Sequence, residues 1–170
     1  MLFGSTQAVF ESAVGDCLGD LYRYAYWLCR DRWQAEDLVQ EAILRAWRGW
    51  PGLRERRAVK GWLFTILYRE FARASVRARV ETVADDDVHL EPADHADPAL
   101  AIDLNRALRT LGEDSRHALL LQVLGGFSCA EIAAVLETSE GAVMTRLTRA
   151  RQSLRRALEP GHDGGEAKEA

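Results

Sequence analysis

Residues 33–50 read WQAEDLVQEAILRAWRGW and contain the clearest structural signal in the chain. Apolar residues recur in this stretch at intervals of three and four, which is the spacing of one helix face. They are Ala35, Leu38, Val39, Ala42, Ile43, Ala46, Trp47 and Trp50. Asp31 and Gln34 offer a capping box at the start, and Pro51-Gly52 ends the helix. Because other segments repeat this spacing and none alternates as a strand does, the sequence predicts an all-α fold.

Charge is distributed unevenly along the chain. A net charge of −4, taken alone, argues against nucleic acid as a partner. However, bases dominate residues 54–79 and 141–158, whereas residues 81–103 hold acids and no Lys or Arg. Two basic segments on either side of an acidic one indicate two parts that each face nucleic acid.

The acidic segment also divides the chain into domains. It contains Pro92 and Pro98 and shows little apolar periodicity before Leu100, as expected of a flexible linker between two small helical domains. We therefore predict a first domain at residues 1–80, an acidic linker at 81–97, a second domain at 98–159 and a polar tail at 160–170.

Further helices are expected on both sides of the long helix in the first domain. Phe10–Val14 and Leu18–Cys29 suggest a helix pair separated at Gly15 and Gly19, since glycine weakens a helix interior. Residues 60–79 suggest another helix after the long one.

The second domain carries a candidate helix-turn-helix. Ser128-Cys-Ala-Glu131 has the spacing of a capping box and begins a short helix that runs to Leu136. Thr138-Ser139 caps a longer helix that runs to Leu158. Two helices joined by a turn of about three or four residues are typical of this DNA-binding motif.

The long helix of residues 33–50 has an outward face that suits protein binding. At about 100° per residue, Leu44 lies almost opposite the apolar stripe and should point to solvent. Polar residues surround it on that face: Asp37, Gln40, Glu41 and Arg48. A protein-binding surface and an ordinary exposed leucine beside a Glu41–Arg45 pair both fit the periodicity equally well.

The two basic segments each place arginines on one helix face. Arg69, Arg73 and Arg77 are spaced by four and share a side with Trp62, which suits phosphates and stacked or flipped bases of single-stranded nucleic acid. In the last helix, Thr145, Arg149, Gln152 and Arg156 face away from the apolar stripe and could enter a major groove. Solvated arginines over a packed core are the alternative for both.

Three stretches resemble one family. Residues 35–47 look like the AEDLVQExFLRAW stretch in region two of extracytoplasmic-function sigma factors of bacterial RNA polymerase. Residues 60–67, KGWLFTIL, resemble the WLxxIA segment of that region. Residues 120–154 resemble the region-four pattern LxxxxGxSxxEIAxxLxxxxGTVxSRLxRAR. The family resemblance covers nearly the whole chain except the linker and the tail.

The resemblance implies three groups of site residues. Binding to core polymerase, through the β′ clamp helices and with the β subunit as a further partner, falls on Asp37, Gln40, Glu41, Leu44, Arg45 and Arg48. Contact with the minus-ten element of promoter DNA falls on Arg54, Arg56, Arg57, Lys60, Trp62, Arg69, Arg73 and Arg77. Recognition of the minus-thirty-five element falls on Gly141, Ala142, Thr145, Arg146 and Arg149.

The chain departs from the family pattern in both regions. Tyr68-Arg69-Glu70 and Ala74 replace the usual minus-ten residues, and Glu70 is expected to bring a negative charge near the DNA path. Glu137 replaces a frequent glycine and Ala142 a frequent threonine, and we expect the fold to tolerate both.

The resemblance implies a sigma factor that binds core enzyme, recognises promoter elements and promotes DNA melting. A sigma mimic that captures an anti-sigma factor and a stand-alone helix-turn-helix regulator are the alternatives. An anti-sigma partner is expected. We expect no enzyme activity, cofactor or metal, because the cysteines Cys17, Cys29 and Cys129 are dispersed and His117 is expected at the surface or boundary of a leucine-rich helix. No apolar run approaches the roughly 20 residues that span a bilayer, so a cytoplasmic protein without membrane insertion is expected.

Overall fold

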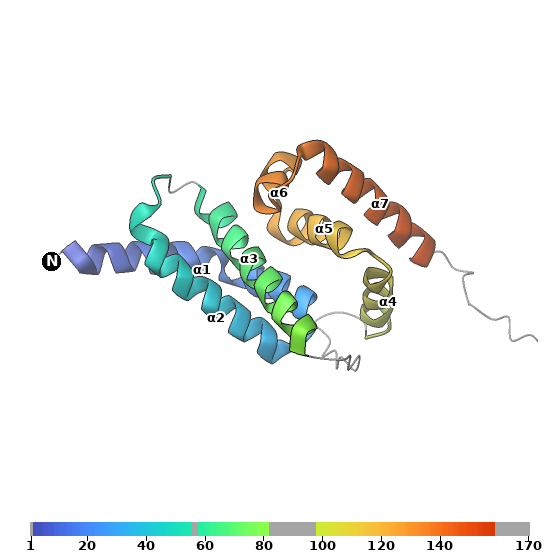
Figure 1. The fold of residues 1–170 in the computed structure, drawn as a ribbon, viewed down its shortest axis with the longest axis horizontal. Helices are drawn as coiled ribbons and strands as arrows, with labels where there is room; N and C mark the ends of the chain where they lie inside the picture. Colours follow the sequence, from blue (N-terminus) through green and yellow to red (C-terminus); the bar gives the residue numbers. More distant parts are fainter. Residues whose placement is uncertain (1, 56–57, 82–97, 159–170) are drawn as a thin grey trace, which may run out of the picture.

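The computed structural model describes residues 2–55, 58–81 and 98–158, and every regular element in them is helical (Figure 1). The first domain consists of α1 (Leu2–Cys29), α2 (Arg32–Gly49), the short 3-10 helix η1 (Trp50–Gly52) and α3 (Val59–Glu81). The second domain consists of α4 (Pro98–Arg109), α5 (Glu113–Gly125), α6 (Cys129–Val135) and α7 (Glu140–Leu158). The all-α prediction is confirmed. The predicted linker, apart from Glu81, and the tail lie outside the described residues.

Helix α1 is a single helix, so the predicted pair separated at Gly15 and Gly19 was wrong. A glycine costs about 1 kcal/mol in a helix interior relative to alanine. Burial of one apolar side chain offsets this, since it contributes about 1.5–3 kcal/mol. Helix α1 buries several on one stripe: Phe10, Val14, Cys17, Leu21, Tyr24 and Leu28. Tertiary burial therefore carries the helix across both glycines.

The predicted helix starts in α2, α6 and α7 are confirmed by their caps. The Asp31 carboxylate accepts the Gln34 N–H at 2.7 Å. Ser128 and Glu131 form both bonds of a capping box, with the Ser128 N–H donating to the Glu131 carboxylate at 2.8 Å. The Ser139 hydroxyl accepts an N–H from the first turn of α7 at 3.2 Å. Helices α6 and α7 therefore form the expected helix-turn-helix.

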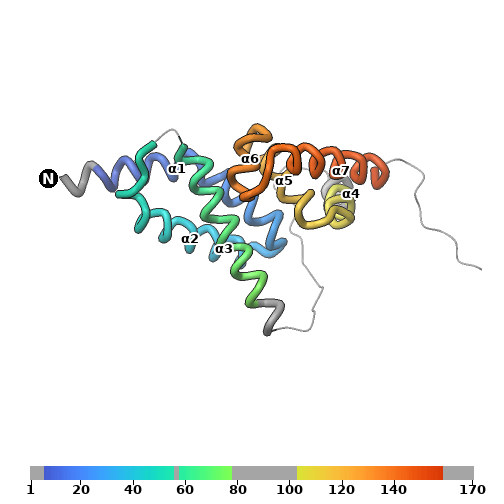
Figure 2. Tube along the Cα trace, turned by 45° about the horizontal axis from the view of Figure 1, so that its top comes forward, coloured from blue at the N-terminus to red at the C-terminus, as the bar shows by residue number. Residues whose placement is uncertain are grey.

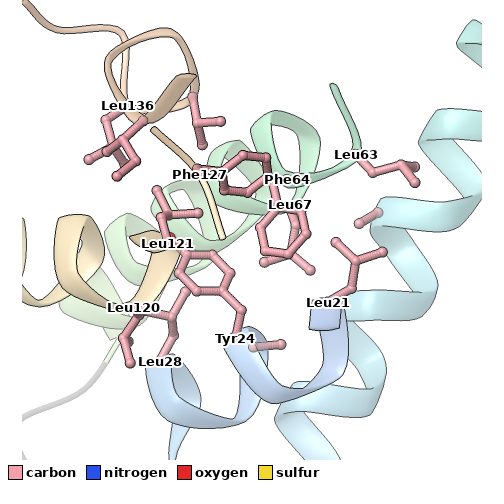
Figure 3. Close-up of a cluster of buried hydrophobic side chains, with 14 of the residues drawn as sticks. Leu21, Tyr24, Leu28, Leu63, Phe64, Leu67, Leu120, Leu121, Phe127 and Leu136 are labelled. Carbon is pink, nitrogen blue, oxygen red and sulfur yellow. The ribbon is translucent and has the colours of Figure 1, made fainter. Parts of the chain in front are cut away.

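The two domains pack directly against each other, which the sequence did not predict. Helices α5 and α6 lie against α1 and α3, and Figure 2 shows the same arrangement from a second direction. The Phe64 and Phe127 rings meet edge-to-face at 5.0 Å between centroids. Figure 3 shows the side chains that form this shared core, from α1, α3, α5 and the α6 region. It includes Leu21, Tyr24, Leu28, Phe64, Leu67, Leu120, Leu121 and Phe127.

His117 lies inside this interface and is only 3% exposed, so the predicted position at the surface or boundary was wrong. Its Nδ1 lies 2.8 Å from the Tyr24 hydroxyl, and its ring contacts the Tyr68 and Phe71 rings edge-on. A neutral imidazole with its proton on Nε2, 3.8 Å from the Glu113 carboxylate, accepts the hydroxyl proton at Nδ1. Helix α5 packs on the second domain with one face and on the first domain with the opposite face. His117 lies on the face toward the first domain and is therefore buried.

Burial, together with the smaller effect of the nearby charge of Arg116, lowers the pKa of His117 from 6.5 to about 4. We expect the free energy of unfolding to decrease as the pH falls from 6.5 toward 4. In that window the unfolded chain binds the proton and the folded chain does not, so the stability is reduced progressively as the pH falls below 6.5. The loss in the free energy of unfolding reaches on the order of 3 kcal/mol near pH 4. Urea unfolding at several pH values, followed by circular dichroism, measures it.

The matched control is the double variant Tyr24→Phe, His117→Phe, which removes the titrating group together with its hydrogen-bond partner. Carboxylates titrate in both proteins, so the quantity to compare is the difference between the two pH profiles. Parallel profiles between pH 7 and pH 5 would contradict the assignment.

Candidate functional site

The outward face of α2 consists of Asp37, Gln40, Glu41, Leu44, Arg45, Trp47 and Arg48. Leu44 is 52% exposed, as its position opposite the buried stripe predicted. Trp47 was expected within the buried stripe, but it lies at the edge of that stripe and is 42% exposed. The covered part of its ring packs on Phe10. The Glu41 carboxylate lies 3.1 Å from Arg45 Nε. An apolar pair bordered by acids and bases therefore stands on one side of the helix.

The sequence suggested that Glu70 brings a negative charge near the DNA path. In the structure, Glu70 is buried instead. Its side chain is 8% exposed, and its carboxylate pairs with Arg45 at 2.9 Å and Arg73 at 2.8 Å. Two guanidinium groups balance the buried charge, so Glu70 ties α2 to α3 and adds no repulsion at the surface. It also fixes Arg45 within the outward face of α2.

The basic row of α3 is present as predicted. Arg69, Arg73 and Arg77 are all exposed. Two of them are already engaged: Arg73 with Glu70, and Arg69, whose Nε donates to the carboxylate of Glu137 in the second domain at 2.7 Å. The row is therefore an exposed basic surface, and through Arg69 it also contacts the second domain.

The other residues predicted for the minus-ten element lie in different surroundings. Lys60 pairs with Asp20 at 2.8 Å, and its Nζ lies 5.6 Å from the centre of the Phe127 ring. Trp62 is half-buried and packs on the Trp50 ring. Arg54 is exposed. Arg56 and Arg57 lie outside the described residues.

Helix α7 presents a mixed outward face over its first turns. Gly141, Thr145 and Arg149 are exposed, and Ala142 is half-buried. Arg146 differs from them, because it is held against α5 by the Asp114 carboxylate at 2.8 Å. Arg146 therefore helps to orient α7 on the domain, whereas Arg149 is held by no such contact to α5.

Sequence reasoning did not single out Met144 and Thr148, which are also exposed on α7. The spacing of the buried residues Val143, Leu147 and Ala150 could have revealed them, since both lie off that stripe.

The described part of the chain contains no group of three His, Cys, Asp or Glu residues placed to hold a metal ion. None of its helices is long and apolar enough to cross a membrane. Burial raises the pKa of Cys17 and raises that of Cys29 to about 11, which favours the protonated thiol at both positions.

Two family models match the chain. The Sigma-70 region 2 model matches residues 13–80, and the Sigma-70 region 4 model matches residues 101–154. Together they cover the helices that carry the outward face of α2, the basic row of α3 and the exposed face of α7.

Curated relatives agree with this match. The ECF RNA polymerase sigma factor SigE of Mycolicibacterium smegmatis is 34% identical over 148 residues, which are 79% of this chain and 56% of that protein. The chain thus spans little more than half of SigE. The ECF RNA polymerase sigma factor SigL of Mycobacterium tuberculosis is 34% identical over 168 residues, which are 91% of this chain and 94% of that protein.

A solved structure resembles the whole arrangement. The sigma factor RpoE from Bartonella quintana, in complex with the anti-sigma factor NepR, matches with a TM-score of 0.79 and 31% identity. The match covers 89% of this chain and 98% of that chain, so both domains take part in it. With both regions of the family present in order, the chain belongs to the sigma-70 family, as an extracytoplasmic-function sigma factor of RNA polymerase.

Proposed function

We propose that the outward face of α2 binds the clamp helices of the core polymerase β′ subunit, with a further contact to the β subunit. The exposure of Leu44 carries this proposal. A leucine that is half exposed among charged residues, on a helix whose opposite face is fully packed, has no role in the fold of the chain itself. Trp47 beside it adds the kind of aromatic group that is enriched in protein interfaces.

The two basic helices are proposed to hold promoter DNA. The arginine row of α3 neutralises phosphates near the minus-ten element, where it promotes strand separation. The exposed face of α7 enters the major groove of the minus-thirty-five element. The protein supplies binding and positioning, and the polymerase, in the cytoplasm, performs the chemistry.

An anti-sigma factor is proposed as the regulatory partner. The similarity to RpoE, which was solved with the anti-sigma factor NepR, supports this. The exposed apolar residues on α2 would be an obvious target for such a partner, since covering them blocks polymerase.

Two other functions fit the fold less well. A sigma mimic would capture an anti-sigma factor without using DNA, which leaves the exposed Arg149 and the basic row of α3 without a role. A stand-alone regulator would leave Leu44 and Trp47 without a role.

Transcription reconstituted with purified core polymerase and a promoter library separates the three functions. A sigma factor initiates at a subset of promoters, a mimic binds core without initiating, and a stand-alone regulator does neither.

Leu44→Asp is expected to weaken binding to core polymerase by about 10-fold or more, because it puts a charge into the apolar centre of the interface. Fluorescence anisotropy of labelled protein titrated with core enzyme measures the change. Val123→Asp is the matched control, since Val123 is 68% exposed on α5 and outside the proposed surface. Equal affinities for Leu44→Asp and the wild type would remove the assignment.

Arg149→Ala is expected to leave core binding unchanged and to weaken promoter binding by the holoenzyme by about 5- to 100-fold, the range for losing one bidentate contact to a base. Arg156→Ala, at the far end of the same helix, is the control and should have a smaller effect. A promoter affinity unaffected by Arg149→Ala would show that α7 does not contact the element as proposed.

A further inference from the structure

The exposed face of α7 is rich in methyl groups over its first turns. Met144 is 57% exposed, and Thr145 and Thr148 are exposed next to it. Both threonine hydroxyls donate to carbonyls one turn earlier in the helix, Thr145 to Gly141 at 3.0 Å and Thr148 to Met144 at 2.9 Å. Their protons are therefore used within the helix, and what this face offers a partner is mainly methyl groups beside Arg149.

Duplex DNA is the partner that fits this face. From residue 141 to residue 158 the chain holds five arginines and no acid, which favours a polyanion. In the major groove, thymine is the base that presents a methyl group, whereas the other bases present donors and acceptors. Met144 and Thr148 are one turn apart and so can meet neighbouring base pairs.

We propose that Met144, with Thr148, recognises thymine methyl groups in the minus-thirty-five element. This rests on the proposed placement of α7 in the major groove. Arg149 supplies the polar contact next to them, and the two apolar side chains make this sigma factor select T·A pairs at the positions they cover.

Deoxyuridine tests the proposal, because it differs from thymidine only by the missing methyl group. Holoenzyme is titrated with a fluorescent promoter obtained from the transcription library, with thymines or deoxyuridines in the minus-thirty-five element. The wild type should bind the deoxyuridine promoter about 3- to 10-fold more weakly, as expected for one or two buried methyl groups.

Met144→Ala should bind the thymine promoter more weakly than the wild type and should lose most of the difference between the two DNAs. Val123→Ala, on an exposed site of α5, should behave as the wild type. The proposal is overturned if deoxyuridine reduces the promoter affinity of Met144→Ala and of the wild type by the same factor. It is also overturned if deoxyuridine reduces the affinity of neither protein. If Arg149→Ala also binds both promoters normally, the placement of α7 in the groove is wrong as well.

Discussion

The aromatic contact between the two domains is the interaction on which the rest of the structure depends. Phe64 of α3 packs on Phe127, and Tyr24 of α1 meets His117 of α5 in the same core. These large side chains bury apolar surface that neither domain covers alone. Burial of apolar surface is the dominant stabilising contribution in a small helical protein. The contact determines which helix faces stay exposed and brings Glu137 to Arg69.

The charged residues are arranged around this core in two ways. Some join helices within a domain: Glu70 with Arg45 and Arg73, and Asp114 with Arg146. Others remain on the outside, such as Arg149 on α7. A chain with net negative charge can therefore present basic surfaces, because several of its acids pair inside the fold and many others concentrate in the segment between the domains.

Much of the fold and of the candidate site was predictable because it depends on local rules. The caps at Asp31 and Ser128 formed where the residue types required them. The exposure of Leu44 followed from helical periodicity, as did the exposed row that contains Arg69. Trp47 was assigned to the wrong side, because a residue at the edge of an apolar stripe can be either covered or exposed.

By itself, the sequence determined the helices, their caps, the two basic faces and the family. Only the tertiary structure decided that α1 continues through Gly15, that Glu70 is buried between guanidinium groups, and that His117 lies against Tyr24. The physical reason is the same in each case. Periodicity shows that a face is covered, whereas the partner that covers it comes from a distant part of the chain, and its burial outweighs local preferences.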